Sequence, residues 1–185
     1  MDFVDAIVGG PRPHGRGSEK LMRSHECVRH NGRVIVGLIS DTHGLLREQA
    51  LRALEGVDHI VHAGDVGKPE IIDALSALAP VVAVRGNIDK GAWADRLPTT
   101  AVAEVRDARI FVLHDLKQLD LDPATAGFHI VVSGHSHKPG RSESAGVLYI
   151  NPGSAGPRRF KLPVTVARLD VGASPWRLDF ISVEE

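Results

Sequence analysis

Residues 34–43 read VIVGLISDTH. The first part, Val34 to Ile39, is a short continuous apolar run, which is typical of a β-strand buried on both faces. Asp41 and His43 follow the run directly, and carboxylate and imidazole groups both bind metal ions. The stretch therefore predicts a central strand of a sheet that ends in candidate metal ligands.

Helical and strand patterns alternate after this stretch. Apolar residues recur at helical spacing between Leu45 and Leu54, and residues 59–63 read as a second strand. A second helix is expected to begin at Pro69, because proline suits the first turn of a helix, and residues 81–84 read as a third strand. This β-α-β-α-β order favours parallel strands joined by right-handed crossovers.

The second half of the chain is predicted to consist mainly of strands. Asp107-Ala108 has the pattern of a tight hairpin turn between two of them. Strands are expected at residues 100–105, 109–113, 130–133, 147–150, 164–169 and 177–183. Together the two halves predict an α/β protein with two packed β-sheets and helices outside them.

Residues 1–32 differ from the rest of the chain. They are rich in glycine and other turn residues and show no hydrophobic period. Such a segment buries too little apolar surface to offset the entropy lost when it is ordered. We therefore expect a disordered or loosely attached N-terminal extension at residues 1–32 and a single domain over residues 33–185.

The composition narrows the classes of function. The chain of 185 residues carries a net charge of −1, which argues against a broad surface for nucleic acid or for an anionic membrane. No apolar run reaches the roughly 18–20 residues that span a bilayer, and the N-terminus has no signal-peptide pattern. The single cysteine, Cys27, excludes an internal disulfide and suits a reducing compartment, so a cytoplasmic location is expected.

Metal-ligand side chains recur at the carboxyl ends of successive predicted strands. Ligands gather at these ends in open α/β sheets, and neighbouring glycines such as Gly64 and Gly134 permit close turns there. Each residue alone is weak evidence, but buried carboxylates without partners are costly, and cations resolve that cost. The joint pattern predicts a cage for two metal ions, with seven candidate ligands: Asp41, His43, Asp65, Asn87, His114, His135 and His137.

The ordered motif series resembles that of the calcineurin-like metallophosphoesterase superfamily. The motifs are Asp41-x-His43, Gly64-Asp65, Gly86-Asn87-x-Asp89, His114, Gly134-His135-x-His137 and Asn151-Pro152-Gly153-Ser154. Residues 33–185 are most similar to its small, cap-less branch, the YfcE-type phosphodiesterases. The resemblance implies a four-layer α-β-β-α sandwich with two mixed sheets. It also implies a metal-dependent phosphodiesterase that acts on a small phosphodiester.

The resemblance further implies roles for the candidate ligands. Asp41, His43 and His137 would hold the first ion. Asn87, His114 and His135 would hold the second ion, and the Asp65 carboxylate would bridge the two ions. Asp65 and Asn87 would take part in catalysis most directly. Such ligands suit Mn²⁺, which is expected first, while Fe²⁺, Ni²⁺, Zn²⁺ and Mg²⁺ stay open. A hydroxide bridging two ions about 3.5–4 Å apart would attack phosphorus in line.

The chain departs from the superfamily pattern near the third and fourth motifs. Most members have a histidine after the Gly-Asn pair, where it can protonate the leaving group, and Ile88 cannot do so. General acid catalysis is worth about 10²–10⁴-fold, so a modest rate with a preference for good leaving groups is expected. Asp89 is then expected to order its loop or support the ligands. Asp115-Leu116 stands where relatives often have Gly-His.

Other histidines, tryptophans and arginines are expected to have structural roles. His62 is predicted to support the site or to lie satisfied in the core rather than to bind metal, because strand alternation points it away from the Asp65 loop. Trp93 and Trp176 are predicted to pack in the core or at an interface rather than to stack on a nucleobase. Arg158 and Arg159 are expected to be a solvated pair rather than a phosphate clamp.

Two other functions stay open. The same superfamily includes a retromer subunit that acts as an interaction scaffold, but such a scaffold should have lost metal ligands that are all present here. A phosphomonoesterase or protein phosphatase usually needs extra loops, a cap or the missing histidine. The sequence also leaves open whether a second copy of the chain completes the site.

Overall fold

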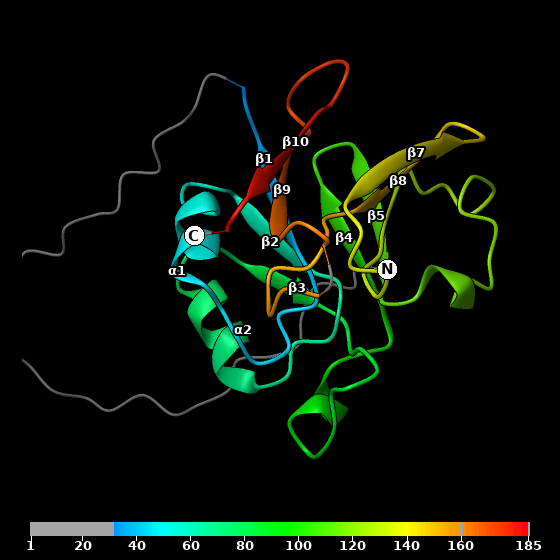
Figure 1. The fold of residues 1–185 in the computed structure, drawn as a ribbon. Coiled ribbons are helices and arrows are strands. Elements are labelled where there is room, and N and C mark those ends of the chain that lie inside the picture. Colours follow the sequence, from blue (N-terminus) through cyan, green and yellow to red (C-terminus); the bar gives the residue numbers. More distant parts are fainter. Residues whose placement is uncertain (1–31, 160, 185) are drawn as a thin grey trace, which may run out of the picture.

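The computed structural model describes residues 32–159 and 161–184, which form two five-stranded mixed β-sheets packed on each other (Figure 1). This confirms the predicted α/β architecture of two packed mixed sheets. Apart from Gly32, the predicted extension lies outside the described residues. Within the described ranges, no helix is long and apolar enough to cross a membrane.

The first sheet contains the three parallel strands that the sequence predicts. β1 (Ile35–Ile39) pairs in parallel with β2 (His59–His62), and β2 pairs in parallel with β3 (Val81–Ala83). β9 (Thr165–Asp170) lies antiparallel against the other side of β1, and β10 (Arg177–Ser182) lies antiparallel against β9. The strand order is therefore β10-β9-β1-β2-β3.

Two helices cover one face of the first sheet (Figure 1). They are α1 (Glu48–Ala53) and α2 (Pro69–Ser76), and α2 begins at its proline as expected. Leu75 of α2 is completely buried in the cluster between helices and sheet. α1 begins later than predicted, because Leu45 is exposed and donates its N–H to the Thr42 carbonyl in a turn.

The second sheet has the order β4-β5-β6-β8-β7. β4 (Thr100–Val105) and β5 (Ala108–Leu113) form an antiparallel hairpin. β5, β6 (Ile130–Val132) and β8 (Val147–Asn151) run parallel, and β7 (Gly140–Ser144) lies antiparallel at the edge. The hairpins at the two edges need no helical crossover, so this part of the chain contains little helix. The three parallel central strands all end at the same side of the sheet.

Three features of the second half differ from the sequence prediction or add to it. β7 was not predicted, because all of its residues are exposed and its sequence, GRSES, has no apolar alternation. The hairpin turn lies at Arg106-Asp107 rather than at Asp107-Ala108, and Ala108 begins β5. Two short 3₁₀ helices, η1 (Ala94–Arg96) and η2 (Leu116–Gln118), lie in connections.

The main core lies between the two sheets. Val36 and Leu38 of β1 face this core together with Ile110 and Val112 of β5, and all four are fully buried. Alternate residues of β1 instead pack under the helices, as expected for a strand that is buried on both faces. Trp93 and Trp176 pack against these clusters, which agrees with the predicted structural role of both.

Candidate metal centre

The loops that follow β1, β2, β5 and β6 meet at one edge of the sandwich. The Asp41 N–H donates to the Gly64 carbonyl at 3.0 Å, and the Gly134 N–H donates to the His114 carbonyl at 3.0 Å. Each of these bonds joins two loops of the same sheet. The His135 N–H donates to Asp41 Oδ2 at 3.1 Å and so joins the loops of one sheet to those of the other. The polar residues that follow these parallel strands therefore lie close together at one edge of the sandwich.

Most of the candidate ligands adopt a left-handed backbone conformation. Aspartate and histidine tolerate this region better than most residues, but it still costs energy. Strain of this kind gathers at functional sites, where the surrounding structure enforces it. Among the described residues other than glycine, Arg106 and Ala145 also adopt it, both in hairpin turns. The ligands concerned, with φ between 47° and 66°, are Asp41, His43, Asp65, His135 and His137.

Asp41, His43 and His137 form the first group that could hold a metal ion. His137 Nε2 lies 3.3 Å from Asp41 Oδ1 and 3.3 Å from His43 Nε2. The Ser40 hydroxyl donates to Asp41 Oδ2 at 2.7 Å, beside the bond from the His135 N–H. The second oxygen of Asp41 is therefore engaged, and Oδ1 is left directed at the two imidazoles.

Asp65 and His114 form the second group, together with Asp41. His114 Nδ1 lies 2.7 Å from the Ala63 carbonyl and must donate to it, which leaves Nε2 as the ligand atom. This Nε2 lies 3.4 Å from Asp65 Oδ1, while Asp65 Oδ2 lies 3.7 Å from His43 Nε2. The Asp65 carboxylate therefore lies between the two groups, with one oxygen toward each.

Three buried polar atoms of the centre have no hydrogen-bond partner among the described residues. They are Asp41 Oδ1, His114 Nε2 and His137 Nδ1. A buried polar atom left without a partner costs about 1–3 kcal/mol. Asp41 Oδ1 faces His137 Nε2, and His114 Nε2 faces Asp65 Oδ1. Such imidazole nitrogens and carboxylate oxygens are a donor set for divalent transition metals. The residues present therefore fit divalent metal ions.

The protonation of Asp65 and of His137 suits metal binding. Burial raises the pKa of Asp41 to about 6. Burial alone would raise the pKa of Asp65, but its interactions with His114 and with the Ile88 N–H outweigh burial and lower it to about 2. Burial lowers the pKa of His137 to about 4. Near neutral pH the centre thus holds an ionised Asp65 and a neutral His137, which are the forms that bind a metal.

His135 and Asn87 lie at the solvent-exposed side of the centre. The His135 ring stands edge-on to His114 with 5.2 Å between the ring centroids, and its Nε2 lies 3.8 Å from Asp115 Oδ2. Asn87 follows β3, and the next residue, Ile88, donates its N–H to Asp65 Oδ1 at 3.0 Å. The structure thus brings the other five candidate ligands into two close groups. It sets the His135 ring beside them, and Asn87 precedes the residue that binds Asp65.

Asp89 orders the loops around the centre, in agreement with the sequence expectation. Its carboxylate accepts from the N–H groups of Val66 and Gly67 at 3.1 Å and 2.7 Å, and from Gly86 at 2.8 Å. These bonds fix the loop after β3 against the loop after β2. Gly86 permits the close contact, because a Cβ there would overlap the backbone and carboxylate of Asp65.

The segment Asn151–Ser154 braces the ligand loops from the other side. Asn151 Nδ2 donates to the Gly134 carbonyl at 2.6 Å, within the loop that carries two histidines. The Ser154 hydroxyl donates to the Asp41 carbonyl at 2.9 Å. Sequence reasoning connected this segment with the site only through the resemblance, because the bonds join residues far apart in the chain.

His62 is a fully buried histidine outside the two ligand groups. The Gly64 N–H donates to its Nδ1 at 3.2 Å, so the ring proton is on Nε2. Thr42 donates its hydroxyl to the Val66 carbonyl and accepts from His62 Nε2 at 3.0 Å. Burial lowers the pKa of His62 to about 4, so the ring is neutral near pH 7. The predicted supporting role is therefore confirmed.

Acidification is expected to destabilise the protein through His62. An unfolded histidine takes up a proton near pH 6.5, whereas the folded ring resists protonation down to a pKa of about 4. The free energy of unfolding should therefore fall as pH falls from about 6.5 to about 4. Thermal melting of the metal-free protein should show a shallower fall in His62→Gln than in the wild type. The exposed His129→Gln is the control, and an unchanged slope in His62→Gln would contradict this role.

Arg159 reaches the metal centre, which the sequence did not predict. Its Nη2 donates to His43 Nε2 at 3.4 Å, and its side chain is otherwise exposed. Arg158 instead lies 3.8 Å from Glu184 Oε2. The two arginines were expected to form a solvated pair, but Arg159 contacts the centre instead. The contact arises because the chain that leaves β8 passes the loop after β1. No local sequence pattern reveals this return.

The sequence of the chain matches a family model. The model of the calcineurin-like phosphoesterase superfamily domain covers residues 34–174. The chain belongs to this superfamily. As a calcineurin-like phosphoesterase it is a metal-dependent phosphoester hydrolase, in agreement with the donor set of the centre. A relative from Methanocaldococcus jannaschii, described as a probable metallophosphoesterase, is 36% identical over 163 residues, which cover 81% of this chain and 83% of the relative.

Solved structures share the fold of this calcineurin-like phosphoesterase. An archaeal phosphodiesterase has a TM-score of 0.65 and 24% identity, over 80% of this chain and 100% of its own. YfcE, a phosphoesterase from E. coli, has a TM-score of 0.61 and 22% identity, over 82% and 100%. Vps29 from Entamoeba histolytica in complex with zinc has a TM-score of 0.62 and 20% identity, over 82% and 100%. These likenesses show that the chain shares the fold of these three proteins.

Proposed function

We propose that this calcineurin-like phosphoesterase is a phosphodiesterase that works with two divalent metal ions. The observation that carries the proposal is the position of Asp65 between the two ligand groups, 3.7 Å from His43 Nε2 and 3.4 Å from His114 Nε2. A carboxylate with one oxygen toward each group is suited to joining two ions. The shared fold of an archaeal phosphodiesterase supports a diester as the substrate.

The proposal keeps the ligand sets predicted from the sequence. Asp41, His43 and His137 would hold one ion, Asn87, His114 and His135 the other, and Asp65 would join them, with Mn²⁺ expected first. When bound, such ions supply an activated water and neutralise the charge of the phosphoryl group. The protein contributes orientation. The Ala63 carbonyl fixes the His114 ring, and Ser40 fixes the Asp41 carboxylate, so that their free atoms point inward.

Arg159 is assigned to the phosphate of the substrate. Its guanidinium lies at His43 Nε2, the atom that a metal ion would take. Once that atom binds a metal, the guanidinium is left beside the centre without a carboxylate partner within salt-bridge distance among the described residues. Its planar pair of N–H donors suits two phosphoryl oxygens. A guanidinium beside the ligand groups supports binding of the substrate phosphate by Arg159.

Replacing Arg159 with methionine is expected to raise KM for a phosphodiester by about tenfold or more, since hydrogen bonds to charged groups contribute about 1.5–3 kcal/mol. Metal content should stay unchanged. Steady-state kinetics with metal analysis would measure both. Arg158→Met is the matched control, because Arg158 faces Glu184 instead. Equal KM values for the two variants would contradict the assignment.

The leaving group is expected to limit the rate. Ile88 has an exposed fraction of 42% beside the centre and offers no proton. General acid assistance is worth about 10²–10⁴-fold in rate. Its absence at this position should therefore lower the rate most for esters of basic alcohols, whose leaving groups need a proton. The proposed enzyme therefore turns over aryl esters faster than alkyl esters.

Hydrolysis of bis-p-nitrophenyl phosphate tests the proposed function. The protein is stripped of metal, Mn²⁺ is added back, and p-nitrophenyl phosphate is assayed in parallel. Metal-dependent turnover that favours the diester is the expected result. Turnover that favours the monoester would replace the proposal with a phosphomonoesterase. No turnover of either ester, with metal shown to bind, would contradict the proposed function.

The second candidate is a metal-binding scaffold of the same fold. The likeness to Vps29 favours it, and one such structure contains zinc, so metal binding alone does not separate the two functions. The complete set of seven candidate ligands favours the enzyme. Turnover in the diester assay is therefore the discriminating observation.

A further inference from the structure

A cavity of about 670 Å³ adjoins the proposed metal centre. It begins at His135 and extends between η2 and the β7–β8 hairpin. Sites for small molecules have volumes of about 300–1,000 Å³, so the cavity has the size of a site for part of a substrate. A phosphodiester held at the centre would reach it with one of its two alcohol groups.

The cavity carries a local excess of positive charge. Lys117, Lys138 and Arg141 line it, with Asp115 as its one carboxylate. Asp115 is already engaged, since it accepts from the Lys117 N–H at 3.0 Å and faces His135. Within the described part of the chain, none of the three cations has a carboxylate within salt-bridge distance. The chain as a whole has a net charge of −1, so this cluster does not reflect a generally basic surface.

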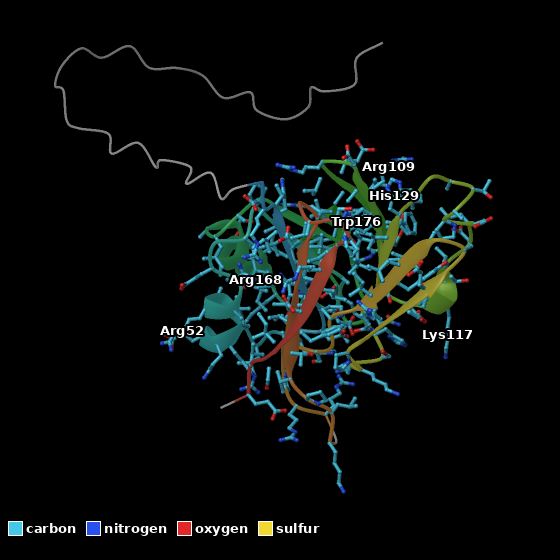
Figure 2. All side chains as sticks on the ribbon, turned by 90° about the horizontal axis from the view of Figure 1, so that it is seen from above. Arg52, Arg109, Lys117, His129, Arg168 and Trp176 are labelled. Carbon is cyan, nitrogen blue, oxygen red and sulfur yellow. The ribbon has the colours of Figure 1, made fainter. Side chains whose placement is uncertain are left out.

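Apolar surface lies next to these cations. Leu116 lines the cavity with 42% of its surface exposed, and Tyr149 lines it from β8. Flat apolar surface beside cations suits a ring that carries an anionic group. Figure 2 shows Lys117 on the side of the molecule that carries the β7–β8 hairpin, opposite Arg52 on α1.

We infer that this cavity binds an alcohol group of the phosphodiester that itself carries a second phosphate. The inference rests on the proposed function and names its substrate class, a 5′-phosphorylated dinucleotide rather than a diester whose two alcohol groups carry no further phosphate. Three clustered cations repel one another, and a phosphate between them relieves that repulsion with charge-assisted hydrogen bonds. The neighbouring Leu116 and Tyr149 would then contact the sugar or base.

Two dinucleotides that differ only in the terminal phosphate test the inference. They are 5′-phosphoadenylyl-(3′→5′)-adenosine (pApA) and adenylyl-(3′→5′)-adenosine (ApA). With Mn²⁺ bound, the wild type should show a kcat/KM for pApA at least about tenfold above that for ApA, which corresponds to about 1.4 kcal/mol. A triple variant, Lys117→Met, Lys138→Met and Arg141→Met, should bring the two values within about twofold of each other. All three residues are exposed, so the variant should keep the wild-type melting temperature.

Arg52→Met is the control, because Arg52 is an exposed cation on α1 far from the cavity (Figure 2). It should keep the preference for pApA. Equal rates on pApA and ApA in the wild type, or a preference that survives the triple substitution, would overturn the inference while the proposed function stands. Hydrolysis of bis-p-nitrophenyl phosphate without hydrolysis of either dinucleotide would also overturn it.

A binding measurement separates this inference from the proposed function. Calorimetric titration of the metal-free protein with pApA needs no turnover. The triple variant should bind pApA about tenfold more weakly than the wild type, and Arg52→Met should bind it as the wild type does. If the protein hydrolyses no ester at all, the proposed function fails, and this titration alone decides the inference. Equal affinity in the triple variant and the wild type would overturn it.

Discussion

Asp65→Asn is expected to lower kcat by more than about 10²-fold, since even the outer partners of metal ligands are worth 10–100-fold. Asp65 presents one oxygen toward His43 and the other toward His114. Its low pKa, about 2, keeps it ionised at neutral pH. Asparagine keeps the shape but loses the charge and one oxygen, so it cannot join two ions in the same way. The measurement is kcat on bis-p-nitrophenyl phosphate at saturating Mn²⁺.

The matched control is Asp179→Asn, an exposed aspartate on β10. It should behave as the wild type. Metal analysis of Asp65→Asn completes the test. A variant that kept near-full activity with its metal still bound would show that Asp65 does not have the bridging role.

Mn²⁺ is expected to raise the melting temperature of the stripped protein by about 5–10 °C at a hundredfold excess over Kd. Binding to the folded state alone contributes about 2.7 kcal/mol at that excess, and 1 kcal/mol shifts Tm by about 2–4 °C for a chain of this size. The physical source is the set of buried ligand atoms without partners, among them Asp41 Oδ1 and His114 Nε2. Differential scanning fluorimetry with and without Mn²⁺ measures the shift.

Two histidine variants make the thermal prediction specific. His137→Ala removes a ligand and should abolish most of the Mn²⁺-dependent shift. His129→Ala removes an exposed histidine outside the centre and should keep it. A full shift in His137→Ala would mean that the stabilising ion binds elsewhere.

The strands and the ligand positions were predictable because both depend on local patterns. Short apolar runs such as Val34–Ile39 define buried strands, and the polar residue after each run lies at the strand end that faces the site. Five of the candidate ligands lie in the two close groups of the structure. Asp89 and His62 also have the supporting positions that the sequence indicated.

The remaining features depend on contacts between distant segments. β7 has the exposed polar sequence GRSES, and only its pairing with β8 makes it a strand. Arg159 reaches His43 because the chain after β8 folds back, which no periodicity records. The cavity beside His135 likewise forms between η2 and the β7–β8 hairpin, and the sequence indicated neither η2 nor β7. Tertiary packing, and not local propensity, decided each of these.

The most direct test of the central claim is a crystal structure of the protein with Mn²⁺, with anomalous scattering recorded to locate the metal. The account predicts two anomalous peaks, both in contact with the Asp65 carboxylate, one bound by Asp41, His43 and His137 and the other by Asn87, His114 and His135. A single peak, or two peaks that do not share Asp65, would contradict the dinuclear centre.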